Sequence, residues 1–72
     1  MSICDLTVGK KGIITVINGD DKLSKRLLAL GCTEGTEVEV TRRAPLGDPL
    51  IISVRGFELA IRKFDAKNIL IR

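Results

Sequence analysis

The feature that most constrains this sequence is a connection with two prolines, residues 44–49, between two runs in which polar and apolar residues alternate. The runs are residues 37–41 and 50–54, and a period of two is typical of an antiparallel sheet with one buried face. Proline lacks the N–H that a sheet interior needs, so residues 44–49 must lie outside the strands. Residues 55–56, an Arg-Gly pair, predict a tight hairpin turn before a third run, residues 57–61. The sequence therefore predicts a three-strand meander.

A strand and a short helix are predicted before the meander. Residues 13–17 form a β-branched run with apolar side chains on both parities, which predicts a strand covered on both faces, one of them by the helix. Leucines at i, i+4 and i+7 then form one apolar stripe, which predicts a helix of about ten residues that depends on tertiary packing. Asp20 or Asp21 is the expected N-cap, and Gly31 is the expected residue just past the helix end.

The residues after the meander complete a small barrel. Residues 65–68 predict a single capped turn and residues 69–71 a last strand. The pattern favours an all-β fold, a small closed SH3-like β-barrel of about five strands with one short α-helix inserted after the first strand, because closure removes open sheet edges. We expect residues 1–72 to be a single domain, near the lower size limit for a self-sufficient core. The predicted core combines the helix stripe with the buried parity of the meander: Leu23, Leu27, Leu30, Val38, Val40, Ile52, Val54, Leu59 and Ile61.

Cysteine usage and hydropathy indicate the cytosol. Two cysteines, Cys4 and Cys32, are too few for the disulfide framework of a small exported domain. No apolar run approaches the roughly 18 residues that span a bilayer, and the first residues lack a signal-like hydrophobic stretch. We therefore expect a cytoplasmic protein with reduced thiols and without direct membrane insertion.

The sequence contains no histidine, which argues against a metal site. Cys4 and Cys32 are weak candidates for metal ligands, because they lack the close spacing of a CxxC pair and Cys4 lies near the N-terminus, where order is usually poor. Ferrous iron commonly takes imidazole and carboxylate ligands. The acidic residues at positions 20–21, 37 and 39 are explained as a helix cap and a solvated strand face. We expect no metal site and no cofactor, with weak binding of ferrous iron or zinc at most.

Enzymatic and nucleic-acid functions are disfavoured. Without histidine the usual general base at neutral pH is missing, no nucleophile–base pair stands out and no glycine-rich phosphate loop is present. The net charge is +3 with acids interleaved, the only aromatic residues are Phe57 and Phe64, and Phe57 falls on the buried parity of the meander. A nucleic-acid module offers concentrated charge and stacking rings. The chain is therefore predicted to be neither an enzyme nor a nucleic-acid-binding protein.

Two leucines off the predicted core suggest an interaction module. Leu28 lies about 100° around the helix from Leu27, and Leu46 lies at the tip of the proline connection. If they fall on one face, Arg26 and Arg43 flank them and give an apolar patch with a basic rim; otherwise they are ordinary partly covered leucines. Two further arginines are candidates for the same docking surface: Arg42 and Arg55. Without Trp or Tyr, a groove that reads proline-rich ligands is excluded.

Six segments, spread over nearly the whole chain, form an ordered set of motifs: residues 5–9 (DLTVG), 26–40 (RLLALGCTEGTEVEV), 44–50 (APLGDPL), 54–56 (VRG), 59–63 (LAIRK) and 66–69 (AKNI). The set resembles the ferrous iron transport protein A (FeoA) family. This resemblance implies an SH3-like barrel, a cytosolic location and service to ferrous iron uptake. The implied partner is ferrous iron transport protein B, a membrane transporter with a cytosolic GTP-binding region. The resemblance implies iron, whereas the residues supply no iron site.

Three functional hypotheses follow. The first is a small cytosolic accessory or regulatory protein of ferrous iron uptake that docks on the cytosolic part of the transporter. The second is a stand-alone SH3-like domain related to metal-dependent repressors, which would bind a proline-rich or metal-bearing segment. The third is a transition-metal carrier that presents Cys32 and carboxylates. The oligomeric state is left open, with a monomer as the expectation.

Overall fold

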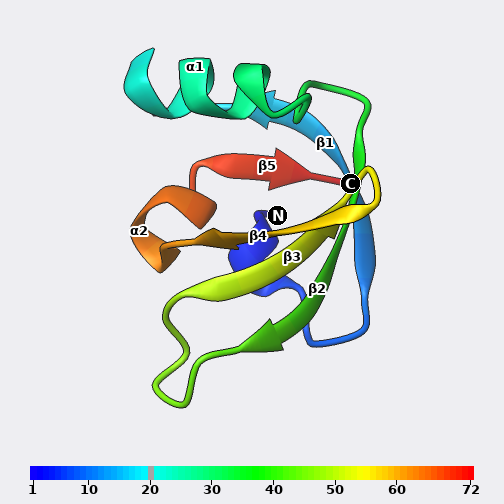
Figure 1. Cartoon of the computed structure of the whole chain (residues 1–72), viewed down its shortest axis with the longest axis vertical. Helices are drawn as coiled ribbons and strands as arrows, with labels where there is room; N and C mark the ends of the chain where they lie inside the picture. Colours follow the sequence, from blue (N-terminus) through cyan, green and yellow to red (C-terminus); the bar gives the residue numbers. More distant parts are fainter. Residues whose placement is uncertain (20) are drawn as a thin grey trace.

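Five strands form one curved antiparallel sheet, and a helix crosses one end of it (Figure 1). The computed structural model describes residues 1–19 and 21–72. The elements in chain order are η1 (Ile3–Asp5, a 3₁₀ helix), β1 (Lys11–Ile17), α1 (Asp21–Ala29), β2 (Glu37–Arg43), β3 (Leu50–Val54), β4 (Phe57–Ile61), α2 (Lys63–Ala66) and β5 (Ile69–Ile71). The strand order is β4-β3-β2-β1-β5. The predicted all-β class, with a short helix inserted after the first strand, is confirmed.

The meander of β2, β3 and β4 has the predicted register. Val38 lies opposite Val54, and Val40 lies opposite Ile52, with all four side chains buried. Residues 44–49 connect β2 to β3 outside the strands, as the two prolines require. The alternation in the sequence therefore identified both the strands and their buried face.

The turn between β3 and β4 is the predicted Arg-Gly hairpin. Arg55 has a φ of 50° and Gly56 has a φ of 89°. Two consecutive positive φ values are those of a type I′ turn, whose twist matches that of the flanking strands. Glycine adopts such a φ without strain, whereas Arg55 is held in the left-handed region by the geometry of the turn.

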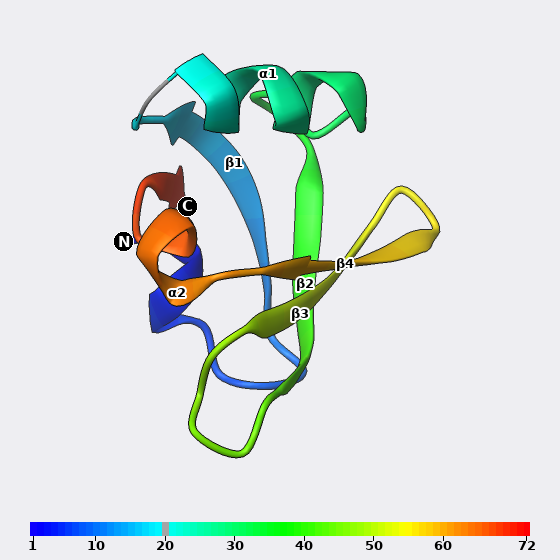
Figure 2. The ribbon, with the colours of Figure 1, turned by 60° about the vertical axis from the view of Figure 1, so that its left-hand side comes forward.

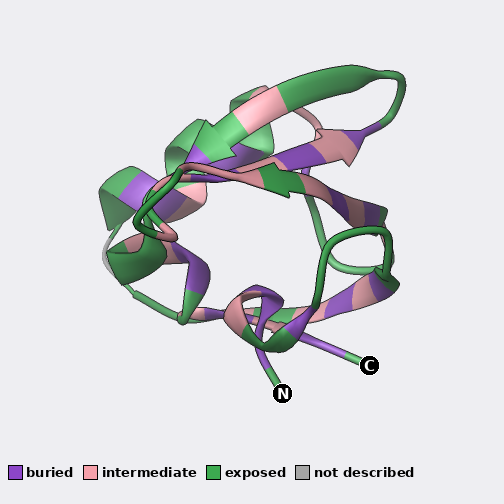
Figure 3. Cartoon of the chain, turned by 90° about the horizontal axis from the view of Figure 1, so that it is seen from below, coloured by how far each residue is buried: buried purple, intermediate pink, exposed green. Residues whose placement is uncertain are grey.

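The sheet curls about β1 into a barrel. The first half of β1 pairs with β2 and the second half with β5, with a register shift between Ile14 and Val16. Figure 3 shows the elements arranged as a ring. Within residues 1–19 and 21–72, no pairing joins β4 to β5; α2 connects them and contacts η1, which also contacts β5. The barrel is therefore completed on this side by short helices rather than by the continuous closure that we expected, because α2 forms where the chain leaves β4.

The core is made of the inward faces of the strands together with α1 and the N-terminal segment. Leu30 and Leu59, both predicted core residues, are half-buried and pack against it, and the other predicted core residues are buried. The prediction for Phe57 is wrong: this residue is 37% exposed, because it begins the edge strand β4 beside the hairpin turn. The buried apolar residues are Ile3, Leu6, Ile14, Leu23, Leu27, Cys32, Val38, Val40, Leu50, Ile52, Val54, Ile61, Ala66, Ile69 and Ile71.

α1 has about the predicted length, and it begins at Asp21. Leu23 and Leu27 are its buried residues, as the leucine stripe predicts. Asp20, the alternative N-cap, lies outside the described residues. The prediction that β1 is covered on both faces is wrong. α1 crosses one end of the barrel instead of lying along the outside of β1 (Figure 2), and Val16 is 42% exposed.

α2 forms slightly before the predicted turn at residues 65–68. The N–H of Lys63 donates to Asp48 Oδ1 at 2.8 Å, so a carboxylate from the 44–49 connection satisfies an amide at the start of α2. This partner is distant in sequence and gives no local signal. Within residues 1–19 and 21–72, no helix has both the length and the apolar character needed to cross a bilayer.

η1 orders the N-terminal segment and was not predicted. The N–H of Cys4 donates to Ser2 Oγ, and the N–H of Ser2 donates to Asp5 Oδ2 at 2.8 Å, which completes a capping box. Ile3 is fully buried in the core. The N-terminal segment is thus packed into the fold, contrary to the expectation of poor order.

Candidate functional site

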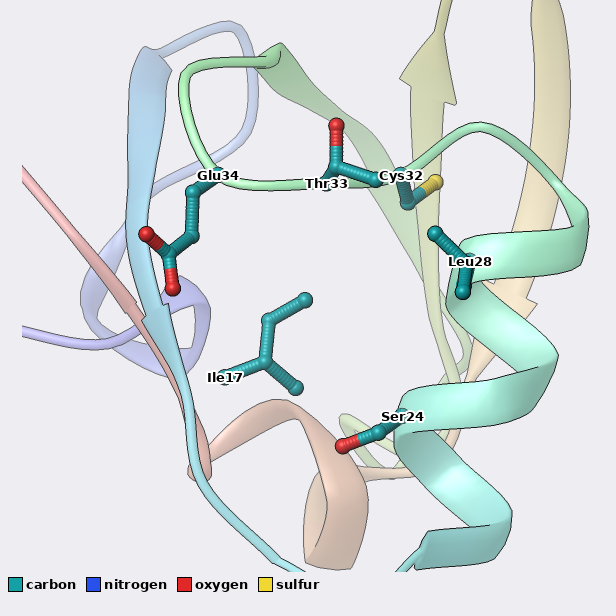
Figure 4. A pocket seen from close by; sticks show the side chains of 6 residues that line it. All are labelled: Ile17, Ser24, Leu28, Cys32, Thr33 and Glu34. Carbon is teal, nitrogen blue, oxygen red and sulfur yellow. The ribbon is translucent and has the colours of Figure 1, made fainter.

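A hollow of about 400 Å³ lies between α1, the end of β1 and the connection from α1 to β2 (Figure 4). We call it the α1 groove, and its lining residues are Ile17, Ser24, Leu28, Cys32, Thr33 and Glu34. Ser24 and Leu28 project from α1 towards Ile17, and Glu34 lies on the side away from the helix (Figure 4). Apolar side chains with a polar rim form the kind of surface that receives an apolar side chain from a partner.

Leu28 is the most exposed apolar residue of the α1 groove. It is 65% exposed, whereas its neighbour Leu27 is 1% exposed. Successive helical residues are separated by about 100°, so one leucine faces the core and the next faces away from it. The prediction that Leu28 lies off the core is confirmed, and its side chain is available to a partner without disturbing the core.

The end of α1 shapes one wall of the groove. Gly31 has a φ of 80°, and its N–H donates to the carbonyl of Leu28 at 3.0 Å. The N–H of Cys32 donates to the carbonyl of Leu27 at 2.8 Å. These two hydrogen bonds define a Schellman motif, which confirms Gly31 as the residue just past the helix end. The reversal brings Cys32 back against the helix and places the next two residues at the groove.

Cys32 behaves as a small apolar residue in this wall. It is buried and belongs to the core cluster. Burial raises the pKa of the Cys32 thiol above its ordinary value, and the positive charge of Arg55 opposes this shift with a smaller effect. The neutral thiol therefore predominates at pH 7, and Cys32 lacks the thiolate character of a nucleophile or a ready metal ligand.

Arg55 lies at the C-terminal end of α1. A Cβ built on Gly31 would lie 3.2 Å from Arg55 Cδ and 3.3 Å from Arg55 Nε, so the arginine side chain covers this glycine. A cation is favourable at the negative end of a helix. A second hollow of about 530 Å³, lined by residues 33–37 and Arg55, adjoins this position. Because Glu34 lines both hollows, Arg55 and Leu28 belong to one end of the molecule.

Leu46 lies far from Leu28. It is 94% exposed in the 44–49 connection, which forms the bottom of Figures 1 and 2, whereas α1 crosses the top. The two leucines therefore do not fall on one face, and the single patch considered from the sequence is not formed. The docking role of each leucine stays a prediction, and the two roles must be tested separately.

Three of the four arginine candidates for docking bond to the protein itself: Arg26, Arg42 and Arg43. Arg26 Nη2 donates to the carbonyl of Ala60 on β4 at 3.2 Å. Arg42 Nη2 lies 3.6 Å from Glu58 Oε1 in an exposed ion pair. An exposed pair of this kind contributes little to stability, so Arg42 is free to exchange Glu58 for a partner.

Replacing Arg43 with methionine is expected to lower the free energy of unfolding by about 2 kcal/mol. Arg43 is half-buried, and its Nη2 donates to the carbonyls of Cys4 at 2.9 Å and Leu6 at 2.6 Å, which ties the N-terminal segment to β2. Arg42→Met is the matched control, with an expected change within about 0.5 kcal/mol because only the exposed pair with Glu58 is lost. Urea unfolding followed by circular dichroism measures both. Equal decreases in the free energy of unfolding of the two variants would show that the Arg43 hydrogen bonds do not stabilise the N-terminal segment.

The cysteines and acidic residues do not gather into a ligand set. Cys4 lies on η1, where its Sγ donates to the carbonyl of Lys63 at 3.5 Å, and Cys32 lies at the α1 groove. Both thiols are free. Across the part of the chain that the structure describes, no three His, Cys, Asp or Glu side chains lie together as metal ligands would. The two weak metal candidates therefore stand on separate elements.

Four residues of the α1 groove were not identified as site residues from the sequence: Ile17, Ser24, Thr33 and Glu34. Ile17 falls in the run predicted as the first strand and Ser24 in the predicted helix, whereas Thr33 and Glu34 follow the predicted helix end at Gly31. The available signal was Gly31, which predicts that the chain reverses after the helix. That signal indicates a reversal, but it does not say which strand the reversed chain will face.

Comparison with known proteins places the whole chain beside one family. A family model described as the FeoA domain matches residues 1–72. One relative is a fusion protein of Porphyromonas gingivalis, described as the Fe(2+) transport protein A/Fe(2+) transporter FeoB fusion protein. It is 29% identical to this chain over 69 residues. The match covers 96% of this chain and 8% of that protein, so the chain spans a small fraction of the relative's length.

Solved structures share the fold over the full chain. The FeoA protein of Chlorobium tepidum is 30% identical with a TM-score of 0.95, and the match covers 100% of this chain and 69% of that one. The FeoA of Stenotrophomonas maltophilia, solved in complex with zinc and described as a prokaryotic SH3 domain protein, is 25% identical with a TM-score of 0.81. That match covers 100% of this chain and 89% of the other. The SH3-like description of the barrel is thereby confirmed.

Proposed function

Because the chain belongs to the FeoA domain family, which is associated with ferrous iron transport, we propose that it is a non-enzymatic accessory protein of ferrous iron uptake in the cytosol. It docks on the cytosolic, GTP-binding region of the ferrous iron transporter. The observation that carries this proposal is the Porphyromonas gingivalis relative, in which the two proteins are fused in one chain. Fusion holds two modules at a high effective concentration, which benefits modules that act on each other.

The α1 groove is the docking face that we propose. It joins an exposed leucine to a hollow of about 400 Å³; Glu34 supplies a negative charge in its lining, and Arg55 supplies a positive charge in the adjoining hollow. A buried apolar anchor usually contributes most of the binding energy of an interface, while rim charges set orientation and association rate. Leu28 is the proposed anchor, and Arg55 and Glu34 are the proposed orienting charges.

A pull-down tests the proposed function directly. The purified chain, tagged at its C-terminus, is offered the purified GTP-binding region of the ferrous iron transporter from the same genome, with an unrelated GTP-binding protein as the control. We expect capture of the transporter region alone. Absence of capture at tens of micromolar protein, about the range of weak transient complexes, would contradict docking on this region.

We expect the isolated chain to bind zinc or ferrous iron weakly or not at all at neutral pH. The sequence has no histidine, Cys4 and Cys32 lie on separate elements, and burial keeps the Cys32 thiol protonated, whereas a metal takes a thiolate. Anaerobic isothermal titration calorimetry measures the affinity, and Cys4→Ser and Cys32→Ser are the variants to compare. Micromolar or tighter binding that either variant abolishes would favour the metal-carrier alternative instead.

A further inference from the structure

The 44–49 connection and α2 carry two of the most exposed apolar side chains of the protein. Leu46 is 94% exposed and Phe64 is 70% exposed. The two segments are joined by the hydrogen bond from the N–H of Lys63 to Asp48 Oδ1, and both lie on the left-hand side of Figures 1 and 2. An exposed leucine alone is ordinary; here the exposed ring and the exposed loop tip stand on two segments that a hydrogen bond joins.

Three cations lie in and beside α2, the helix that carries Phe64. Arg62, Lys63 and Lys67 are exposed, and Lys67 Nζ lies 5.0 Å from the centroid of the Phe64 ring. Asp48 and Asp65 lie on the same two segments and offset two of these three positive charges, which leaves a net charge of +1. We call this region the Leu46–Phe64 surface, and it consists of Leu46, Arg62, Lys63, Phe64 and Lys67. It presents two exposed apolar side chains, with a small excess of positive charge at α2.

We propose that the Leu46–Phe64 surface rests on an anionic lipid bilayer, with Leu46 and Phe64 at the depth of the headgroups and the cations on lipid phosphates. Leu46 is 94% exposed and projects from a loop tip, and such a side chain suits a soft medium into which it can insert. The Lys67 ammonium group lies over the Phe64 ring, so an apolar group and a positive charge stand side by side, as in an anchor at the membrane interface. The contact is made at the membrane surface and involves no spanning segment.

The proposed function would bring the Leu46–Phe64 surface close to a membrane. Docking through the α1 groove would hold the chain on a membrane transporter, while the Leu46–Phe64 surface belongs to other elements and stays free. Two apolar side chains and a few cations give only weak, reversible binding to vesicles. The inference rests on the proposed function for its biological role alone, because vesicle binding is a property of the isolated chain.

Vesicle flotation tests the inference. The intact chain is mixed with phosphatidylcholine vesicles that contain or lack phosphatidylglycerol, at low and high salt. We expect partition into the anionic vesicles only, and weaker partition as salt rises. The variant Lys63→Gln/Lys67→Gln is expected to bind about 25-fold more weakly, about fivefold for each lysine. Leu46→Ser/Phe64→Ser is expected to bind at least about tenfold more weakly, because its apolar tips are lost.

Matched controls separate this surface from net charge. Lys22→Gln/Lys25→Gln removes the same charge from exposed positions on α1, and Leu28→Ser removes an exposed leucine there. Each of these two control variants is expected to retain at least about half of the vesicle binding of the wild type. Three results would overturn the inference. The first is no partition into anionic vesicles, and the second is a loss of vesicle binding in the α1 lysine variant equal to that of Lys63→Gln/Lys67→Gln. The third is a Leu46→Ser/Phe64→Ser variant that loses capture of the transporter region while its vesicle binding is unchanged. The last would assign the surface to a protein partner. Because vesicles contain no transporter, failure of the docking proposal leaves this test intact.

Discussion

Leu28→Glu is expected to lower the affinity for the cytosolic region of the transporter about 30-fold or more, while the protein stays folded. Leu28 is 65% exposed in the α1 groove, so its side chain contributes little to the core and is free for a partner. Glutamate removes the apolar anchor and adds a carboxylate that must lose water on docking. Isothermal titration calorimetry with the transporter region measures the affinity, and thermal unfolding followed by circular dichroism checks the fold.

Leu46→Glu is the matched control for that variant. It makes the same change at a leucine that is 94% exposed and lies away from the α1 groove. Because we propose the α1 groove as the docking face, we expect an unchanged affinity for the transporter region, a result that would remove Leu46 from the docking candidates. If Leu28→Glu unfolds the protein, Leu28 belongs to the core. If it folds and binds with unchanged affinity, docking occurs elsewhere, and Arg42 and Arg55 are the next residues to test. Their contribution would weaken as ionic strength rises, whereas that of an apolar anchor would change little.

Leu27→Ala is expected to lower the free energy of unfolding by about 2–5 kcal/mol. Leu27 is 1% exposed and packs in the core where α1 crosses the end of the barrel. At roughly 0.05–0.15 kcal/mol per residue, a chain of 72 residues has a total free energy of unfolding of about 4–11 kcal/mol. This one truncation therefore comes close to unfolding the protein. Urea unfolding gives the value. Leu28→Ala, one residue along the same helix, is the control, and we expect a change within about 0.5 kcal/mol. Similar losses for the two variants would contradict the placement of the helix on the barrel.

Local patterns predicted the strands and the helix of this protein. The alternation on either side of residues 44–49 predicts β2 and β3 and their buried faces, because the side-chain period of a strand is fixed by its backbone. The leucine stripe and Gly31 likewise predict the buried face and the end of α1. These features depend on residues a few positions apart, and such patterns are visible in a sequence.

Features that depend on distant residues were missed. α2 starts where Asp48 accepts from the N–H of Lys63, and the N-terminal segment is held by Arg43 of β2. Neither partner can be paired from sequence spacing alone. The same limit applies to Phe57, whose parity is correct for burial but whose strand lies at the sheet edge.

The candidate site was predicted only in part. Leu28 was identified because its helical position is off the apolar stripe, and its exposure follows from the geometry of the helix. The groove beside it needs Ile17 and Glu34, which come from β1 and from the connection after α1. Whether Leu46 shares a face with Leu28 is set by how α1 sits on the barrel, and that placement is a property of the tertiary fold.

A nuclear magnetic resonance titration tests the proposed docking most directly. The isotopically labelled chain is titrated with the unlabelled GTP-binding region of the transporter, and the amide signals that shift map the contact surface. We expect the shifts to concentrate on the α1 groove, from Ser24 to Glu34 and at Ile17, with the amides of residues 44–49 and α2 unchanged. Shifts confined to residues 44–49 and α2, or no shifts when the transporter region is in excess, would contradict docking through the α1 groove.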